Sequence, residues 1–322
     1  MKKLVVIVSL LAAFVGNTAT VEAANAQTAK EIRIATQPSL SYIPIFIAKQ
    51  KHWLEDDLKR SGVTVKWTSF ISGPPENETF AAGQQDLGFI GDTPAIILRS
   101  AGVNTRIVGI ASVGPKTLGV VARRNSGIKT IADLRGKRVG ITKGSVSHDL
   151  LYLLLQKANV KVSDVRIVHL QPADLINAFN HGDIDAGAAW EPFLARLEEN
   201  GTLIADGTGV KQGLRPIFVR NDFATANPVL VVKVLQAYQR GYQFAKAHPR
   251  EASQLVASDV NLPADQIFKV IGKFDYNPAI RQDVTVDLKR TEEFLRANNL
   301  SRSHVDIDSF LDSRYLQQAG LK

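Results

Sequence analysis

Residues 80–92 read FAAGQQDLGFIGD, and residues 179–191 read FNHGDIDAGAAWE. At an offset of 99, the two stretches share one Phe, two Gly and one Asp at the same spacing. A shorter echo joins residues 36–42, TQPSLSY, to residues 142–148, TKGSVSH, in which one Thr and two Ser recur at an offset of 106. This self-similarity indicates that two segments of about 80 residues share one order of elements.

Each segment is expected to alternate short strands with helices, because β-branched and apolar runs alternate with stretches of helical periodicity. In the first segment, strands are predicted at residues 32–35, 63–71 and 87–90, and helices at 42–58, 76–82 and 92–100. In the second, strands are predicted at 139–141, 165–170 and 184–189, and helices at 148–158, at 173–180 and from 191 onward. Such alternation predicts an α/β fold in which each sheet is mostly parallel and flanked by helices.

The repeated polar loops are the ones that follow strands. Right-handed crossovers place such loops at one edge of each sheet, where ligands of α/β folds bind. We therefore expect two similar lobes across a ligand cleft. Two helix N-termini of each lobe point into it, after Thr36 and Gly91 in one lobe and after Thr142 and Trp190 in the other. Their free N–H groups and positive dipole ends suit a small oxyanion and need no metal.

The chain is expected to cross between the lobes twice. Clusters of Gly and Pro favour hinges near residues 111–117 and 206–216. Residues 27–113 and 215–322 then form the first lobe, and residues 117–210 form the second. Further helices, expected to pack on the first lobe, are predicted at 229–247, 263–273, 286–297 and 309–318.

Residues 1–26 have the features of a secretory signal peptide. Lys2 and Lys3 precede a nearly uninterrupted apolar run from residue 4 to 15, and Ala24-Asn25-Ala26 forms an A-x-A cleavage site. That run is shorter than the ~20 residues of a membrane span. Because the chain has no Cys, it lacks a lipidation cysteine and disulfides. We therefore expect a soluble, exported protein of a Gram-negative periplasm without a lipid anchor.

The charge and the absent motifs narrow the function. A net charge of +8 favours anionic small ligands, whereas export and the lack of a basic-aromatic motif argue against nucleic acid. Ser147, His148 and Asp149 are helix neighbours and cannot face one another as a catalytic triad. The sequence has no G-x-S-x-G turn, Walker A loop or metal-binding spacing among its six histidines. We expect no catalysis, no cofactor and no metal.

The sequence resembles the periplasmic solute-binding proteins of ATP-driven (ABC) importers for nitrate, taurine and aliphatic sulfonates, and is most similar to the alkanesulfonate-binding members. The resemblance spans residues 31–300 and is carried by residues 91–94 (GDTP), 133–139 (DLRGKRV), 143–148 (KGSVSH), 190–193 (WEPF) and 205–209 (ADGTG). It implies the two-lobed periplasmic binding protein fold of type II, which closes around one solute and docks on a membrane permease. The first loop, residues 36–39 (TQPS), departs from the Gly-Tyr-Gln type of sulfonate binders.

Candidate ligand contacts of the first lobe are Gln37, Ser39, Tyr42, Gly91, Asp92 and Thr93. The backbone N–H groups after Asp92 and the Thr93 hydroxyl are anion donors. Asp92 itself favours a capping role, since a carboxylate repels an anion. Tyr42 has two alternatives: a wall of the pocket or helix packing.

Candidate ligand contacts of the second lobe are Gly144, Ser145, Ser147, His148, Trp190 and Glu191, with Thr117 at the crossing. Ser145 and Ser147 also suit helix capping, and His148 is either an N–H donor or a plain helix residue. Trp190, unless it is a core residue, offers an aromatic wall to an organic tail. Glu191 either caps a helix or meets a ligand ammonium.

These features predict a monomeric solute-binding protein of an ABC importer that captures a small organic anion, most simply an aliphatic sulfonate used in sulfur metabolism, for a permease and ATPase at the inner membrane. Taurine, nitrate and a heteroaromatic thiamine precursor remain alternative ligands. A periplasmic sensor remains an alternative role.

Overall fold

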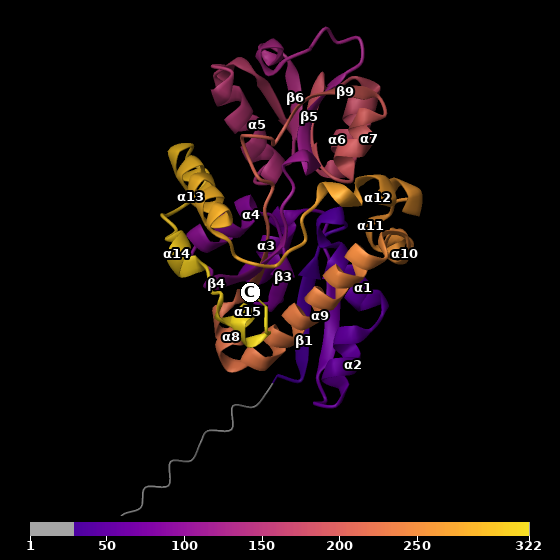
Figure 1. Ribbon diagram of the computed structural model, residues 1–322. Helices are drawn as coiled ribbons and strands as arrows, with labels where there is room; N and C mark the ends of the chain where they lie inside the picture. The colour runs from indigo at the N-terminus through magenta and orange to yellow at the C-terminus, as the bar shows by residue number, and fades with distance from the viewer. Residues whose placement is uncertain (1–28, 322) are drawn as a thin grey trace, which may run out of the picture.

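Two five-stranded sheets organise the chain (Figure 1). The computed structural model describes residues 29–321, so the predicted signal peptide lies outside the described residues. The first sheet has the order β2-β1-β3-β10-β4, and the second has the order β7-β6-β8-β5-β9. The strands of the first sheet are β1 (Glu31–Thr36), β2 (Thr64–Ser69), β3 (Leu87–Phe89), β4 (Thr105–Ser112) and β10 (Arg215–Arg220). Those of the second are β5 (Leu118–Arg123), β6 (Arg138–Ile141), β7 (Arg166–His169), β8 (Ala186–Trp190) and β9 (Gly201–Asp206). We call each sheet with its helices a lobe.

The two sheets are mixed, and in each of them one strand runs opposite to the other four. Strand β1 runs parallel to β2 and β3, and β6 runs parallel to β7 and β8, as predicted. Strands β10 and β5 are antiparallel to both of their neighbours. The parallel strands end at the edge that faces the other lobe. β5 and β10 begin there, since each follows a crossing between the lobes, and they therefore run the opposite way.

The sequence repeat corresponds to one structural clamp built twice. In the first lobe, Asp86 at the start of β3 accepts hydrogen bonds from the backbone N–H and the guanidinium of Arg33, at 2.9 and 2.5 Å. In the second lobe, Asp185 makes the same two contacts to Arg138, at 2.8 and 2.9 Å. Each Asp ties a pair of parallel strands together, which is why Asp recurs at an offset of 99.

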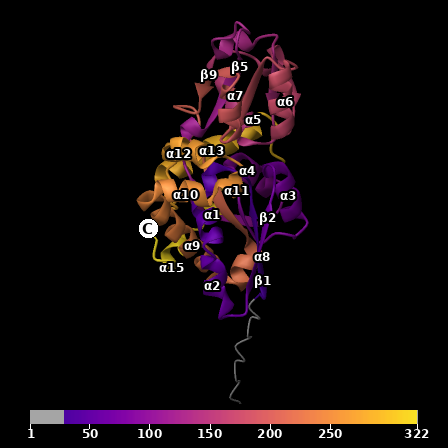
Figure 2. The same cartoon turned by 90° about the vertical axis from the view of Figure 1, so that its right-hand side faces the viewer.

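Helices pack on both faces of the first sheet, and other helices pack on the second sheet (Figures 1 and 2). The helix predicted at residues 42–58 is two helices, because His52 adopts a left-handed backbone with φ 53°. The helices before the return crossing are α1 (Ile43–Gln50), α2 (Trp53–Lys59), α3 (Gly73–Ala81), α4 (Asp92–Ser100), α5 (Val146–Lys157), α6 (Pro172–His181) and α7 (Phe193–Glu198). Short 3-10 turns are η1 (Leu40–Tyr42), η2 (Pro115–Thr117), η3 (Ile131–Leu134), η4 (Val162–Asp164) and η5 (Ile271–Lys273).

The C-terminal helices pack mainly on the first lobe. Helix α9 lies along α1, and its Tyr238 is fully buried beside the ring of Phe89. Helix α13 packs against α4 and also touches α5 of the second lobe, so it lies where the lobes meet (Figure 1). These helices are α8 (Asn221–Ala226), α9 (Pro228–Ala247), α10 (Pro249–Leu255), α11 (Ala257–Val260), α12 (Ala264–Val270), α13 (Gln282–Ala297), α14 (Ile307–Phe310) and α15 (Arg314–Gln318).

The chain passes between the sheets through two short segments. It leaves the first sheet after Ser112 and enters the second at Leu118, then leaves after Asp206 and returns at Arg215. These segments overlap residues 111–117 and 206–216, where the sequence suggested crossings. Among residues 29–321, no helix combines the length and the apolar character needed to cross a membrane.

Candidate ligand-binding site

A small cavity lies between the lobes, where the predicted loops meet. With the lobes in this arrangement, it has room for about one water molecule. It lies at the ends of β1 and β8, at the N-termini of α4 and α5 and at the start of β10. Its lining consists of Gln37, Gly73, Gly91, Pro94, Ser145, Val146, Trp190 and Arg215.

The two lobes approach closely at helix N-termini. Gly91 is the N-cap of α4, and Ser145 is the N-cap of α5, with its hydroxyl accepting the His148 N–H at 3.4 Å. A Cβ added to Gly91 would lie only 2.4 Å from a methyl carbon of Val146. Glycine is therefore required for this approach, which brings two positive helix ends to one cavity.

Arg215 places a full positive charge at the cavity. Its side chain is 2 % exposed, and Nη1 donates to the backbone carbonyl of Leu214 at 3.1 Å. Nη2 is buried without a hydrogen-bond partner in the described chain. Burial lowers the pKa of this guanidinium, but arginine stays cationic. A buried cation without a carboxylate partner is costly, so this one is suited to an anion from outside.

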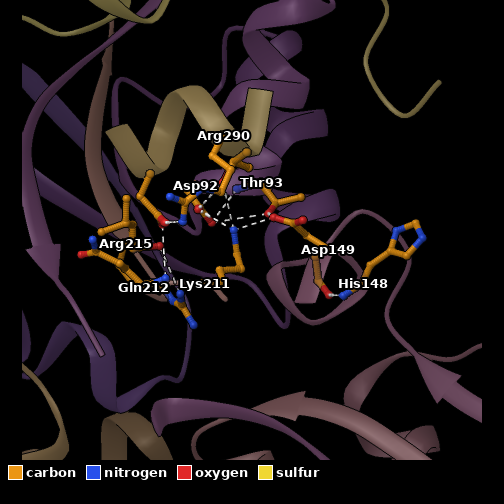
Figure 3. Close-up of polar contacts among 12 residues, drawn as sticks. Asp92, Thr93, His148, Asp149, Lys211, Gln212, Arg215 and Arg290 are labelled. Carbon is orange, nitrogen blue, oxygen red and sulfur yellow. Dashed lines mark hydrogen bonds and ion pairs between the residues drawn. The ribbon is translucent and has the colours of Figure 1, made fainter. Parts of the chain in front are cut away.

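A second buried cation, Lys211, joins the two lobes (Figure 3). Its Nζ donates to Asp92 of the first lobe at 2.7 Å and to Asp149 of the second at 2.5 Å. Its third N–H donates to the Thr291 hydroxyl of α13 at 3.2 Å, and Thr93 donates to Asp149 at 3.1 Å. All three ammonium protons are thus used within the protein.

Burial and the charges within this group shift the pKa values of its members. Burial alone would lower the pKa of Lys211, but attraction to Asp149, Asp92 and Asp287 raises it above its usual value. Burial, opposed by Lys211 and assisted by the Asp92 charge, raises the pKa of the Asp149 carboxyl. Burial also raises the pKa of Asp287 to about 6. The group therefore serves contact between the lobes rather than anion binding.

Further contacts cross between the lobes around the cavity. Glu191 pairs with Lys273 at 2.9 Å and caps α7 by accepting the Ala195 N–H at 3.2 Å. The Ser39 hydroxyl donates to the backbone carbonyl of Glu191 at 3.2 Å. The lobes are therefore closed on one another in this structure.

Four of the predicted contacts line the cavity, and they are Gln37, Gly91, Ser145 and Trp190. Asp92, Thr93 and Glu191 hold the lobes together instead. Tyr42 is 1 % exposed and packs edge-to-face on Phe89, so packing is the alternative that the geometry favours.

The remaining predicted contacts surround the cavity without lining it. Ser147 lies behind Ser145, with its hydroxyl 2.9 Å from that of Ser145. Ser39 bridges the lobes, and Thr117 donates to the Gly114 carbonyl at 2.6 Å within the first crossing. Gly144, with φ +74°, lies in the turn before α5.

His148 is a structural residue in this arrangement. Its Nδ1 accepts the Gly144 N–H at 3.1 Å, and its ring packs edge-to-face on Tyr152 at 4.5 Å. Burial, with the nearby charges of His169 and Lys143, lowers its pKa to about 4, so the ring is neutral at pH 7. In Figure 3 it points away from the Lys211 group.

Sequence reasoning missed Arg215 and Lys211. Both belong to the stretch KQGLRP, residues 211–216, which was interpreted only as a hinge. The signal was two basic residues within a Gly-rich crossing that has to run beside the cleft. Within residues 29–321, no group of three or more His, Cys, Asp or Glu is placed to hold a metal ion.

Comparison with known proteins shows which family the chain belongs to. A family model described as NMT1/THI5 like matches residues 39–252. The chain belongs to the NMT1/THI5-like family. A Bacillus subtilis (strain 168) protein that carries the name of an aliphatic sulfonates-binding protein is 31 % identical over 99 % of this chain and 96 % of its own. The predicted family is therefore confirmed.

Solved structures share the fold of this NMT1/THI5-like protein. The aliphatic sulphonate binding protein SsuA from Escherichia coli superposes with a TM-score of 0.77 at 29 % identity, covering 88 % of this chain and 92 % of that one. The alkanesulfonate-binding SsuA from Xanthomonas axonopodis pv. citri, solved with MOPS bound, superposes with a TM-score of 0.80 at 25 % identity, over 88 % of this chain and 99 % of that one. The predicted two-lobed fold class is confirmed.

Proposed function

We propose that this protein is the periplasmic solute-binding component of an ABC importer and that its ligand is a short aliphatic sulfonate. The observation that carries the proposal is the buried Arg215 guanidinium, unpaired in the described chain, at a cavity where two helix N-termini meet. Guanidinium, hydroxyl and backbone N–H donors converging on one point match the three oxygens of a sulfonate head.

The walls of the cavity favour an organic tail over nitrate. Trp190, Val146 and Pro94 present apolar surface beside Arg215. Nitrate is a compact polar ion with no apolar part to cover these groups, whereas an alkyl chain would take them out of water.

The ion pairs disfavour taurine, which carries an ammonium. The cavity lining contains no carboxylate among the described residues. Asp92 is paired with Lys211 and Glu191 is paired with Lys273, so both nearby acids already have a cation. A ligand ammonium would lose its hydration without gaining a partner.

The proposed cycle is binding and release without chemistry. The segments at residues 111–117 and 206–216 act as hinges, and the ligand stabilises the closed lobes because only then is it contacted from both sides. The closed monomer then docks on a permease and its ATPase. The likeness to the SsuA proteins over most of the chain supports this proposal.

Calorimetric titration of the purified protein against ethanesulfonate, taurine, nitrate and sulfate tests the proposal. Ethanesulfonate is expected to bind at least about tenfold more tightly than taurine, with little heat from nitrate, and to be recovered unchanged. Heat from nitrate alone, or turnover of any of the four solutes, would overturn it.

A further inference from the structure

Glu76 occupies a core position that is apolar in the other lobe. At the repeat offset of 99, its counterpart is Leu175. Gly88 and Gly187 confirm the equivalence, since a Cβ on Gly88 would lie 2.7 Å from a Glu76 oxygen, and a Cβ on Gly187 would lie 3.1 Å from Leu175. The same core site therefore holds a carboxyl in one lobe and an alkyl group in the other.

The surroundings of Glu76 disfavour a charge. The side chain is fully buried, beside the rings of Phe80 and Phe218 and the backbone of Gly88. It makes no ion pair with a described residue, and Oε1 has no hydrogen-bond partner. Burial raises the pKa of Glu76 well above its usual value, with the Gln37 contact opposing the shift.

The charged and titratable groups near this site lie on three other elements. The Tyr42 hydroxyl of η1 interacts with the Glu76 charge, and Tyr42 in turn interacts with Asp92 of α4 and Arg215 of β10. Asp92 is neutralised by Lys211, and Arg215 faces the cavity. None of them pairs with the Glu76 carboxyl, so the neutral acid is the form that this site accommodates.

Within residues 29–321, the Glu76 side chain has one recorded hydrogen-bond partner, Gln37, which also lines the ligand cavity. Oε2 of Glu76 accepts a hydrogen bond from Nε2 of Gln37 at 2.7 Å. The orientation of the amide therefore decides whether the cavity meets a donor or an acceptor.

We propose that protonated Glu76 is a positioning residue that turns the amide NH2 of Gln37 toward the ligand. In this arrangement the amide is turned by 180° from its orientation in the structure, where its NH2 donates to Glu76, and the turn leaves its shape unchanged. The carboxyl O–H then donates to the amide oxygen, and the amide presents its two N–H donors to the oxyanion. An ionised Glu76 instead attracts the NH2 group and leaves the amide oxygen facing the anion. This inference rests on the proposed function. It adds that the affinity for the anion depends on the proton of the buried Glu76 carboxyl.

Two substitutions separate this role from packing. Glu76→Leu restores the alkyl group of the second lobe and removes the O–H donor, so ethanesulfonate affinity is expected to fall about tenfold or more, measured by calorimetry. Glu76→Gln can donate its own NH2 to the Gln37 oxygen, so it is expected to keep most of the affinity. Glu78→Gln, the same change at an exposed position of α3, is the matched control.

The pH profile gives the second readout. Wild-type affinity is expected to fall as the pH rises through the raised pKa of Glu76 and the carboxyl loses its proton, whereas the affinity of Glu76→Gln stays flat. A sulfonate head keeps its charge as the pH rises, so the change reports on the protein. Equal affinity of wild type and Glu76→Leu, or equal pH profiles of wild type and Glu76→Gln, would overturn the proposal.

A ligand-free measurement distinguishes this inference from the proposed function. The infrared difference spectrum between wild type and Glu76→Gln at pH 7 is expected to show the C=O band of a protonated carboxyl. A carboxylate band there rejects the protonated Glu76 whatever the ligand is. If the protonated band is present but wild type binds no ethanesulfonate, the ligand assignment fails instead, and repeating the Glu76→Leu titration with the anion that does bind decides the positioning role.

Discussion

Lys211 and Arg215 lie four residues apart on the return crossing, and each is 2 % exposed. Lys211 uses all three of its N–H donors on Asp92, Asp149 and Thr291. Arg215 uses one donor on a backbone carbonyl, and its buried Nη2 has no hydrogen-bond partner among residues 29–321. Burial of a cation is therefore not enough to identify a ligand site. The difference lies in whether the protein supplies the counter-charge.

The largest effect is expected for Lys211→Met, which leaves Asp92 and Asp149 buried without their cation. Loss of one partner from a buried ion pair costs about 3–5 kcal/mol of unfolding free energy, measured by urea unfolding at pH 7. Lys289→Met is the control, since Lys289 pairs with Asp308 at 2.7 Å on the surface and such pairs contribute about 0–1 kcal/mol. Equal losses in both variants would contradict the structural role of Lys211.

Arg215→Met is expected to separate binding from stability. Ethanesulfonate affinity should fall about 100-fold, since charge-assisted hydrogen bonds to the anion are lost. The ligand-free protein should be as stable as wild type or more so, because an unpaired buried charge is removed. Arg124→Met, at an exposed position in the turn after β5, should change neither property. A severe loss of stability in Arg215→Met would place Arg215 with Lys211 as a structural cation.

Asp287 lies near Lys211 together with Asp92 and Asp149, so a variant at Asp287 tests whether this group holds more carboxylates than one lysine can neutralise. Burial raises the pKa of the folded Asp287 carboxyl from its ordinary value of 3.8 to about 6, so its ionisation costs stability as the pH rises through this interval. Asp287→Asn removes that cost. Relative to wild type, the variant is expected to gain about 2 kcal/mol of unfolding free energy between pH 4 and pH 7, measured by urea titration at both values. A constant difference would contradict the shift.

The smallest effect is expected at the α5 N-terminus. Replacing Ser145 and Ser147 together by Ala should weaken ethanesulfonate binding about tenfold and cost about 1 kcal/mol of stability through the lost cap. Ser147→Ala alone should do less, because only Ser145 lines the cavity. Unchanged affinity of the double variant would remove this turn from the site and leave Arg215 as the main anion contact.

The repeat allowed most of the fold to be predicted. The clamps of Asp86 and Asp185 are local in each lobe and recur at fixed spacing, so the strand and helix order could be followed along the sequence. The antiparallel strands β5 and β10 were not predicted, because their direction follows from where the chain crosses between lobes. Residues at helix starts, such as Ser145 and Gly91, were predictable because strand-to-helix loops share an edge.

The individual roles at the site were less predictable. Thr93 and Ser145 each lie at a helix start, yet Thr93 bonds to Asp149 and Ser145 lines the cavity. For Trp190 the sequence left two alternatives, a pocket wall or a core residue; the side chain lines the cavity and also belongs to the buried core of the second lobe. Glu76 could be noticed only once Leu175 was known to fill the equivalent space.

By itself, the sequence determined that two similar lobes direct helix N-termini at one gap, because strand and helix signals are local and repeat along the chain. Only the tertiary structure decided that Lys211 is paired with carboxylates and that Arg215, among the described residues, is not. The partners of Lys211 lie 119, 62 and 80 residues away in sequence, and no local spacing brings them together. Since Asp92 and Asp149 are both used on Lys211, Arg215 remains as the charge that a ligand can neutralise.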